Sequence, residues 1–162
     1  MKKIVSILLF IYGGVFAQPN LVSNPGFESH TLCTNAYNQI WYCKFWTGVP
    51  GCPSITDVAD YFTGCGTPGY APPSIAPAWQ IPHGGDSFIG ITSANNWGNC
   101  REYAQTLLLD SLIPGVKYSV SYYANLAGKS YFCLASNKLG ALFTTYQIPS
   151  NISLPALNFA QV

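Results

Sequence analysis

Hydrophobic and polar positions in this chain alternate over short segments, as they do in β-strands. No window keeps apolar residues at the 3.6-residue spacing of a helix, so we expect no long helix. Strand-like segments separated by turn residues are expected at 87–92, 100–109, 117–124 and 140–146. In the third segment, every second residue from Tyr118 to Ala124 would share one face of a sheet. The pattern predicts an all-β domain folded as an antiparallel β-sandwich.

Two other segments depart from this alternation. Residues 24–28 read Asn-Pro-Gly-Phe-Glu, which predicts a turn, then an apolar anchor and a carboxylate where a strand starts. Residues 32–82 show no regular pattern and contain seven prolines and five glycines. An irregular region this long in a compact domain usually serves a function, is held by disulfides, or both.

Residues 1–17 have the three parts of a secretory signal peptide. Two lysines follow the initial methionine, residues 4–12 form a short apolar run, and residues 15–17 read Val-Phe-Ala, which is similar to a cleavage site. The apolar run is shorter than the ~20 residues of a membrane-spanning helix. Cleavage would leave a mature chain that is secreted or held on the outer cell surface, with no membrane span.

The mature chain is expected to be a single β-sandwich domain over residues 18–162, incomplete at its C-terminal end. Residues 158–162 begin what reads as a further strand, with no turn after it. An antiparallel sandwich that stopped there would expose an unpaired edge and part of its core. We therefore interpret the chain as part of a longer protein.

The small net charge of the chain argues against some classes of binding partner. Loss of the two leading lysines would leave five basic residues against six acidic ones, a net charge of −1. So weak a charge, with no basic cluster, argues against nucleic acid or an anionic membrane as a partner. Charged residues make up 8% of the chain, where about 25% is usual, and aromatic residues make up 15%. The apolar content is high enough for a folded core.

All six cysteines follow the signal peptide and are candidates for disulfides: Cys33, Cys43, Cys52, Cys65, Cys100 and Cys133. An even number in an exported protein indicates up to three bridges, whose connectivity the sequence leaves open. Four of the six fall within 33–65, where bridges would staple the irregular region. The last two lie in apparent strands and could pair across a sheet. Zinc binding would need tight pairs such as Cys-x-x-Cys, which the chain lacks.

Several short motifs follow one another in a familiar order. They are Asn-Pro-Gly-Phe-Glu at 24–28, Asp-Tyr-Phe at 60–62 with Cys65, Gly-Gly at 84–85, Arg-Glu-Tyr at 101–103 and Gly-Val-Lys-Tyr-Ser-Val-Ser-Tyr-Tyr at 115–123. The combination resembles the N-terminal jelly-roll domain of secreted and surface proteins of Bacteroidetes associated with gliding motility and type IX secretion. The opening turn and the last motif are also similar to carbohydrate-binding modules of the galactose-binding-like fold. The resemblance covers most of residues 20–162 and implies a jelly-roll β-sandwich.

The resemblance also implies a structural calcium ion near the opening turn, where Glu28 matches the acidic residue that such modules use. Calcium takes six to eight oxygen ligands, so Glu28 would need backbone carbonyls and a further acid. In the family, a late strand contributes an acidic ligand, and we expect that strand to lie beyond residue 162. The alternative is that Glu28 is a solvated or hydrogen-bonded carboxylate at the start of a strand. No other cofactor is expected.

Trp97 is the first candidate for a sugar-binding residue. It lies in a loop with three amide side chains, those of Asn95, Asn96 and Asn99. Sugar recognition stacks a ring on an exposed aromatic face while planar polar side chains bind the hydroxyls. The irregular half supplies further aromatic candidates: Trp41, Tyr42, Trp46, Tyr61, Tyr70 and Trp79. The alternative is that these rings are core or loop anchors, which we favour for Trp46 because it matches a packing tryptophan of such modules.

Arg101 is a further candidate ligand-binding residue and the only arginine in the chain. Its planar guanidinium could clamp a pair of hydroxyls or a carboxylate. It could equally hold Asp57 or Asp60 in a structural ion pair. We favour the structural role, because a buried guanidinium needs a partner.

Catalysis is not expected. Residues 85–87 read Gly-Asp-Ser, which looks like the nucleophile block of GDS-type esterases. Such an enzyme needs a histidine base after the serine, whereas His30 and His83 both precede it. A glycosidase would need two carboxylates flanking a cleft, and nothing in the sequence positions such a pair among the six acids.

The sequence therefore predicts a non-catalytic secreted or cell-surface module that binds a carbohydrate or glycoconjugate through loop aromatics. The alternative is a structural or adhesive spacer that contacts other surface proteins. A serine esterase or glycosidase ranks third. Sugar binding predicts a solvent-exposed tryptophan beside free amides, whereas a spacer predicts that all four tryptophans are buried.

Overall fold

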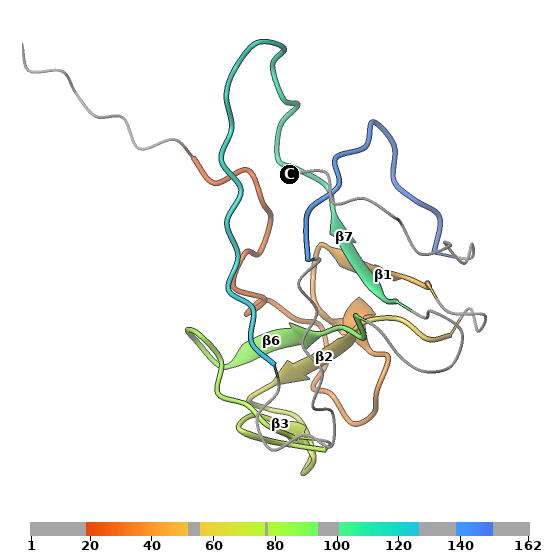
Figure 1. Cartoon of the computed structure of the whole chain (residues 1–162). Coiled ribbons are helices and arrows are strands. Elements are labelled where there is room, and N and C mark those ends of the chain that lie inside the picture. Colours follow the sequence, from red (N-terminus) through yellow and green to blue (C-terminus); the bar gives the residue numbers. More distant parts are fainter. Residues whose placement is uncertain (1–18, 52–55, 77, 94–100, 127–138, 151–162) are drawn as a thin grey trace, which may run out of the picture.

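The computed structural model describes residues 19–51, 56–76, 78–93, 101–126 and 139–150 (Figure 1). In chain order, the elements are η1 (Ile40–Tyr42), β1 (Trp46–Val49), β2 (Asp60–Thr63), β3 (Tyr70–Ala71), β4 (Ser74–Ile75), β5 (Ala78–Trp79), β6 (Ser87–Gly90) and β7 (Tyr103–Thr106). Because η1 is a single 3-10 turn, the described part of the chain is all-β, as predicted. Within these ranges, no helix is long and apolar enough to cross a bilayer.

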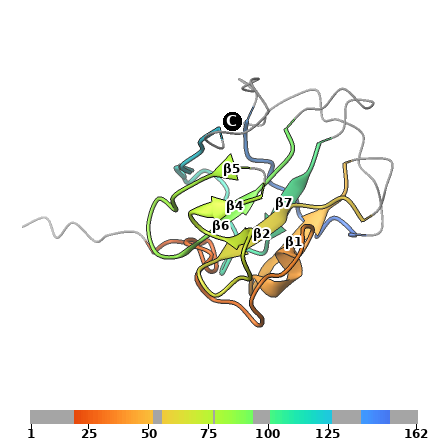
Figure 2. The same ribbon diagram turned by 90° about the horizontal axis from the view of Figure 1, so that it is seen from below.

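The strands form small antiparallel ribbons. β1 pairs with β7, with Trp46 opposite Thr106, and β2 pairs with β6, with Asp60 opposite Gly90. β3, β4 and β5 form a three-stranded meander with strands of two residues each. Figure 1 shows the β1–β7 and β2–β6 ribbons as neighbours, and Figure 2 shows the same arrangement from below.

The hydrophobic core lies where η1 meets the two ribbons. Its buried centre is Ile40, Val58 and Ala59, and half-buried residues from β1, β6 and β7 pack against it: Trp46, Ile89 and Ala104. Gly48 in β1 permits this packing, because a Cβ at that position would lie 2.6 Å from Cβ of Val58. The two ribbons thus share one core, as the layers of a small β-sandwich do.

The opening turn forms as predicted and is tied to the start of β1. The N–H of Phe27 donates to the carbonyl of Asn24 at 3.0 Å, which closes the turn. The Asn24 side-chain amide donates to the carbonyls of Ser29 and Lys44, at 3.0 and 3.1 Å. Nε1 of Trp46 donates to the Asn24 carbonyl at 3.1 Å, and its ring lies on Phe27 with centroids 4.9 Å apart. Trp46 is therefore a packing residue, as expected.

Two of the predicted strands are wrong. Residues 87–92 and 100–109 contain β6 and β7, but 117–124 and 140–146 form no strand. Every residue of 119–124 is exposed, and Figure 1 shows this part of the chain running along the outside of the ribbons. Alternation indicates extended backbone, but a strand also needs a partner edge and a buried face to fix its register. Among the described residues, no strand pairs with 117–124, and this segment has no buried face.

The irregular middle of the chain also differs from the prediction. Residues 32–82 hold η1 and the five strands β1 to β5. These strands are two to four residues long, so each shows too little alternation to stand out among the surrounding prolines and glycines. The predicted signal peptide and the last predicted strand, 158–162, lie outside the described residues.

Candidate functional site

A pocket of about 270 Å³ opens beside the β1–β7 ribbon. It is formed by the N-terminal segment, the η1–β1 segment, β7 and a residue of the C-terminal segment. The lining residues are Ser23, Trp41, Cys43, Lys44, Phe45, Trp46, Thr47, Gln105, Thr106, Leu107 and Gln147. The lining therefore combines aromatic rings with amide, hydroxyl and ammonium groups.

Trp41 and Phe45 present aromatic rings to solvent at this pocket. Trp41 is 56% exposed and Phe45 is 66% exposed. Trp41 lies in η1, whose turn is closed by the Cys43 N–H donating to the Ile40 carbonyl at 2.9 Å. Phe45 has a φ of +72°, a left-handed conformation that is unusual for a bulky residue. A strained backbone that holds an apolar ring in solvent is a reason to look for function at that place.

The polar side of the pocket is anchored to β7. Nε2 of Gln105 donates to the Ile148 carbonyl at 2.6 Å, and its Oε1 accepts the Ile148 N–H at 3.1 Å. The neighbouring Gln147 is exposed, and its Nε2 contacts Oγ1 of Thr47 at 3.5 Å. Lys44 is exposed at the same pocket. The pocket thus offers an amide, a hydroxyl and an ammonium group within one small space.

Glu28 joins the opening turn to the loop before β6. Its Oε2 accepts the N–H of Asp86 at 3.0 Å, and its Oε1 accepts the N–H of Ser87 at 3.1 Å. Gly85, at a φ of +69°, lies so close that a Cβ there would overlap the Glu28 carboxylate. Glu28 is therefore a hydrogen-bonded carboxylate, which was one of the two roles expected from the sequence. Its role as a calcium ligand stays a prediction.

Ser87 lies in a buried cluster of hydroxyl groups. It is 3% exposed, its Oγ donates to Oγ1 of Thr63 at 3.1 Å, and it accepts from the Tyr61 hydroxyl at 3.3 Å. The Tyr61 hydroxyl has a single proton, which it shares between Ser87 and the Phe27 carbonyl, 2.8 Å away. Neither neighbouring hydroxyl is a general base near neutral pH, so these bonds hold β2 and β6 together rather than activate a nucleophile.

Two half-buried carboxyl groups lie apart from the pocket and accept backbone N–H groups. Asn38 donates to Oδ1 of Asp60 at 2.6 Å, and Thr92 donates to Oε2 of Glu102 at 2.8 Å. Burial raises the pKa of Asp60 to about 6, although the Asn38 bond acts in the opposite direction. Burial also raises the pKa of Glu102 to about 7, opposed by the Thr92 bond and assisted by the nearby Asp60 charge. Neither residue lines the pocket.

The structure places one disulfide among the described cysteines, between Cys33 and Cys65. Cys43, also a predicted candidate, is instead a free and buried thiol, so the prediction of a disulfide at this cysteine is wrong. Its Sγ lies 3.3 Å from the Asn24 side-chain amide and 3.7 Å from the Phe27 carbonyl oxygen. Burial raises the pKa of this thiol to about 12, so it stays protonated. Cys52, Cys100 and Cys133 lie outside the described residues.

Most of the predicted sugar-binding residues also lie outside the described residues: Trp97, Asn95, Asn96 and Asn99. Arg101 is half-buried and does not line the pocket. A Cβ at Gly51 would overlap the Arg101 carbonyl oxygen, so the two backbones lie in direct contact. Both predicted roles of the Arg101 side chain, ligand clamp and ion-pair partner, stay predictions.

The sequence predicted Trp41 and Trp46 among several aromatic candidates but did not predict the polar side of the pocket. Thr47 and Gln147 are 100 positions apart, and no local pattern predicts their contact. Phe45 read as one more apolar residue, because its positive φ has no signature in the sequence. The position of His30 beside the Cys33–Cys65 disulfide also has no sequence signal.

A scan against known protein families, a search of curated proteins and a search of solved structures each found no match. The site therefore has to be interpreted from its own geometry.

Proposed function

We propose that this protein is a non-catalytic, exported surface module that binds a carbohydrate or glycoconjugate at the pocket beside β1 and β7. The observation that carries the proposal is the exposure of Trp41 and Phe45 at a pocket that also contains Lys44, Thr47 and Gln147. A sugar offers an apolar ring face and several hydroxyls. It therefore matches a site with aromatic faces and a few polar side chains.

The size of the pocket suggests what part of a glycan it takes. A volume of about 270 Å³ lies just below the range of about 300–1,000 Å³ that is typical of small-molecule sites. It suits one sugar ring, such as a chain end, rather than a long oligosaccharide. With few ordered polar contacts, the affinity for a single ring is expected to be weak, and tight binding would need several copies of the module or of the sugar.

The exposure of the tryptophans supports sugar binding over a spacer. Of the three described tryptophans, Trp41 is 56% exposed, Trp79 is 47% exposed and Trp46 is half-buried. A spacer with every tryptophan in its core does not match these values. At the pocket, Trp41 is accompanied by the exposed amide of Gln147.

We extend the proposal to the family that the motifs resemble, the jelly-roll domains of secreted Bacteroidetes proteins and the galactose-binding-like modules. The formed turn at 24–27 and the packing of Trp46 behind it support this assignment. A structural calcium ion at Glu28 belongs to the same proposal. Localisation outside the cell is supported by the Cys33–Cys65 disulfide, because such bonds persist in oxidising compartments.

A glycan array probed with the oxidised protein, with and without calcium, tests the proposal. We expect binding that weakens about tenfold or more in Trp41→Ala, which corresponds to the loss of about 1.4 kcal/mol of stacking. Trp79→Ala is the matched control, because it removes another exposed tryptophan that does not line the pocket. A folded protein that binds no glycan in either condition would contradict the proposal.

The alternative, an adhesive module for other surface proteins, is favoured by a separate observation. Residues 107–123 expose a run of large apolar side chains: Leu107, Leu109, Ile113, Val116, Val120, Tyr122 and Tyr123. Exposed apolar groups in one segment are typical of a contact surface. Deletion of residues 112–123 separates the two functions, because it would remove protein adhesion and leave sugar binding at the pocket.

A further inference from the structure

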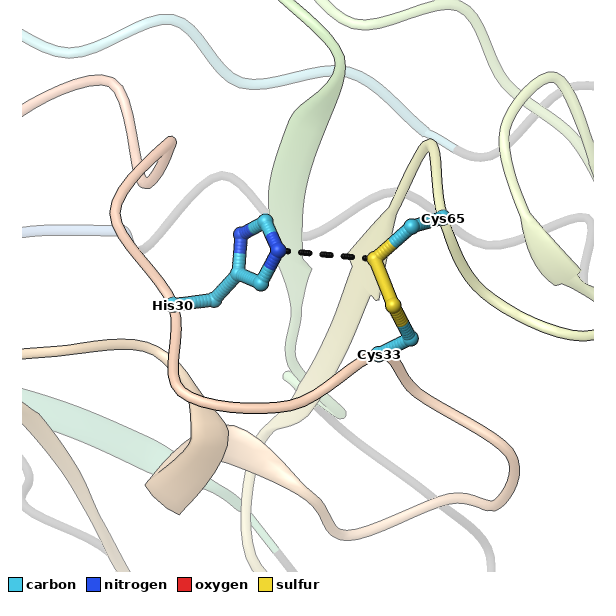
Figure 3. Close-up of side chains that lie close together, drawn as sticks. All are labelled: His30, Cys33 and Cys65. Atoms are coloured by element: carbon cyan, nitrogen blue, oxygen red, sulfur yellow. Dashed lines mark hydrogen bonds between the residues drawn. A yellow bond between two sulfur atoms is a disulfide. The ribbon is translucent and has the colours of Figure 1, made fainter.

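His30, Cys33 and Cys65 bring three metal-ligand atoms together at one place on the protein (Figure 3). Nε2 of His30 lies 3.4 Å from Sγ of Cys65, and the three ligand atoms all lie within 4.8 Å of one another. Both cysteines are exposed, and none of the three residues lines the pocket at β1 and β7. The cluster is therefore separate from the proposed sugar site.

The hydrogen bond of His30 Nδ1 determines whether Nε2 has a lone pair available for a metal ion. Nδ1 lies 3.0 Å from the carbonyl oxygen of Glu28. A carbonyl can only accept, so the proton of the neutral ring is on Nδ1, and Nε2 directs a lone pair toward Cys65. Histidines that bind metals are usually oriented in this way, with the other ring nitrogen donating to a backbone carbonyl or a carboxylate.

The backbone around the cluster is held by bonds other than the disulfide. The segment of His30 is bridged to that of Cys43 in antiparallel fashion. The residue after Cys33 is a fully buried threonine that donates to the Tyr70 carbonyl at 3.1 Å. The residue after Cys65 donates its N–H at 2.8 Å to close a turn at the end of β2. None of these bonds involves the disulfide, so we expect the three side chains to stay close when it opens.

We propose that reduction of the Cys33–Cys65 disulfide converts this cluster into a site for one zinc ion, bound by two thiolates and one imidazole. The reductant is a dithiol, which becomes a disulfide while Cys33 and Cys65 each gain a proton. Both protons leave when the thiolates bind Zn²⁺. Nε2 of His30 is the third ligand, and water takes the fourth position because the site is exposed.

The observed distances suit a tetrahedral ion. Zinc binds sulfur at about 2.3 Å and histidine nitrogen at about 2.0–2.1 Å, which places ligand nitrogen and sulfur about 3.5 Å apart in a tetrahedron. Nε2 of His30 is already 3.4 Å from Sγ of Cys65. The two sulfurs then separate to about 3.7 Å by side-chain rotation. Their Cα atoms, 5.3 Å apart, can stay in place.

The proposal makes metal binding depend on the redox state. In an oxidising compartment both sulfurs are held in the disulfide, and only one ligand, His30, remains. In a reducing environment the same loop junction is held by zinc instead of the covalent bond. Metal binding would then replace the structural contribution of the disulfide, because binding to a folded site stabilises the fold.

Cobalt(II) titration of the reduced protein tests the proposal, because tetrahedral cobalt bound to thiolates gives charge-transfer and visible d–d absorption. A background variant with Cys52, Cys100 and Cys133 replaced by serine leaves the proposed pair and the buried Cys43 as its only cysteines. We expect one cobalt per chain, displaced by zinc, and no such absorption from the oxidised protein. Zinc should also protect Cys33 and Cys65 from alkylation, which mass spectrometry localises.

His30→Ala in that background separates the proposed site from chance thiol binding. It leaves the disulfide intact, so folding of the oxidised variant can be verified first, and metal affinity should fall at least tenfold after reduction. Equal affinity in His30→Ala, or cobalt absorption from the oxidised protein, would overturn the proposal. If the reduced protein unfolds, recovery of its circular dichroism on adding zinc supports the site. Failure of zinc to restore it counts against the site.

Discussion

Removal of the Glu28 carboxylate is expected to destabilise the fold whether or not calcium is present. The carboxylate accepts the N–H of Asp86 at 3.0 Å and the N–H of Ser87 at 3.1 Å, and so joins the opening turn to β6. Hydrogen bonds to charged groups are worth about 1.5–3 kcal/mol each. Water replaces the carboxylate at the exposed Asp86 N–H, so the main loss is at the half-buried Ser87 N–H. We expect Glu28→Ala to lower the free energy of unfolding by about 1.5–3 kcal/mol.

Urea unfolding of the oxidised protein, followed by circular dichroism, measures this difference from the shift in midpoint at constant slope. Asp110→Ala is the matched control, because it removes one exposed carboxylate whose Oδ1 accepts the N–H of the next residue at 2.7 Å. Its effect should stay within about 0.5 kcal/mol. The comparison therefore separates the two backbone bonds of Glu28 from the general effect of losing a negative charge.

Two results would refute this reasoning. An unchanged free energy of unfolding in Glu28→Ala would mean that water satisfies both N–H groups as well as the carboxylate does. A loss that occurs only with calcium would assign the carboxylate to a metal ion, as the family resemblance implies. Repeating the titration with calcium and then with a chelator distinguishes the two outcomes.

Three further predictions follow from buried groups and from the disulfide. In the folded state the pKa of Asp60 is raised to about 6 and that of Glu102 to about 7. Between about pH 4 and 7 the folded state therefore binds more protons than the unfolded state. The free energy of unfolding should fall as pH rises through this window. Asp60→Asn should remove part of this pH dependence and stabilise the protein at pH 8 by about 2–3 kcal/mol, as measured by urea unfolding. If the free energy of unfolding kept the same dependence on pH, burial of the Asp60 carboxylate would not be its cause. Replacing Cys33 and Cys65 by serine opens a loop with a sequence separation of 32. The free energy of unfolding should fall by about 3–4 kcal/mol, which lowers the Tm. An unchanged Tm would contradict a stabilising role of the disulfide. Gly48→Ala would place a methyl group 2.6 Å from the Val58 side chain in the core and should lower the free energy of unfolding by about 1–3 kcal/mol. A free energy of unfolding close to that of the unmodified protein would contradict this prediction.

The sequence predicted the fold class because its signals are local. The turn at 24–27 depends on four adjacent residues, and the absence of helical periodicity excluded long helices. Alternation alone wrongly predicted strands at 117–124 and 140–146. Whether such a segment forms a strand depends on pairing with a strand edge that is distant in sequence. The short strands between residues 46 and 79 were missed for the opposite reason, since two to four residues carry little pattern.

The candidate site was predictable only in part. Trp41 belonged to the predicted set of aromatic candidates, and Glu28 was singled out as a strand-start carboxylate. The pocket depends on contacts between residues far apart, such as Thr47 and Gln147, and on the positive φ of Phe45. Neither of these follows from residue type or spacing. The same limit applies to Cys43, because no pattern in the sequence distinguishes this free, buried thiol from the cysteines that form the disulfide.

Sugar binding at the pocket beside β1 and β7 can be measured at the tryptophan side chains. We would titrate the ¹⁵N-labelled oxidised protein with the best glycan from the array and follow the indole N–H resonances by NMR. We expect a saturable shift of the Trp41 resonance while that of Trp79 stays in place. No shift of any indole, or a shift of Trp97 without Trp41, would contradict it, and the second result would move the site to the loop that the sequence first suggested.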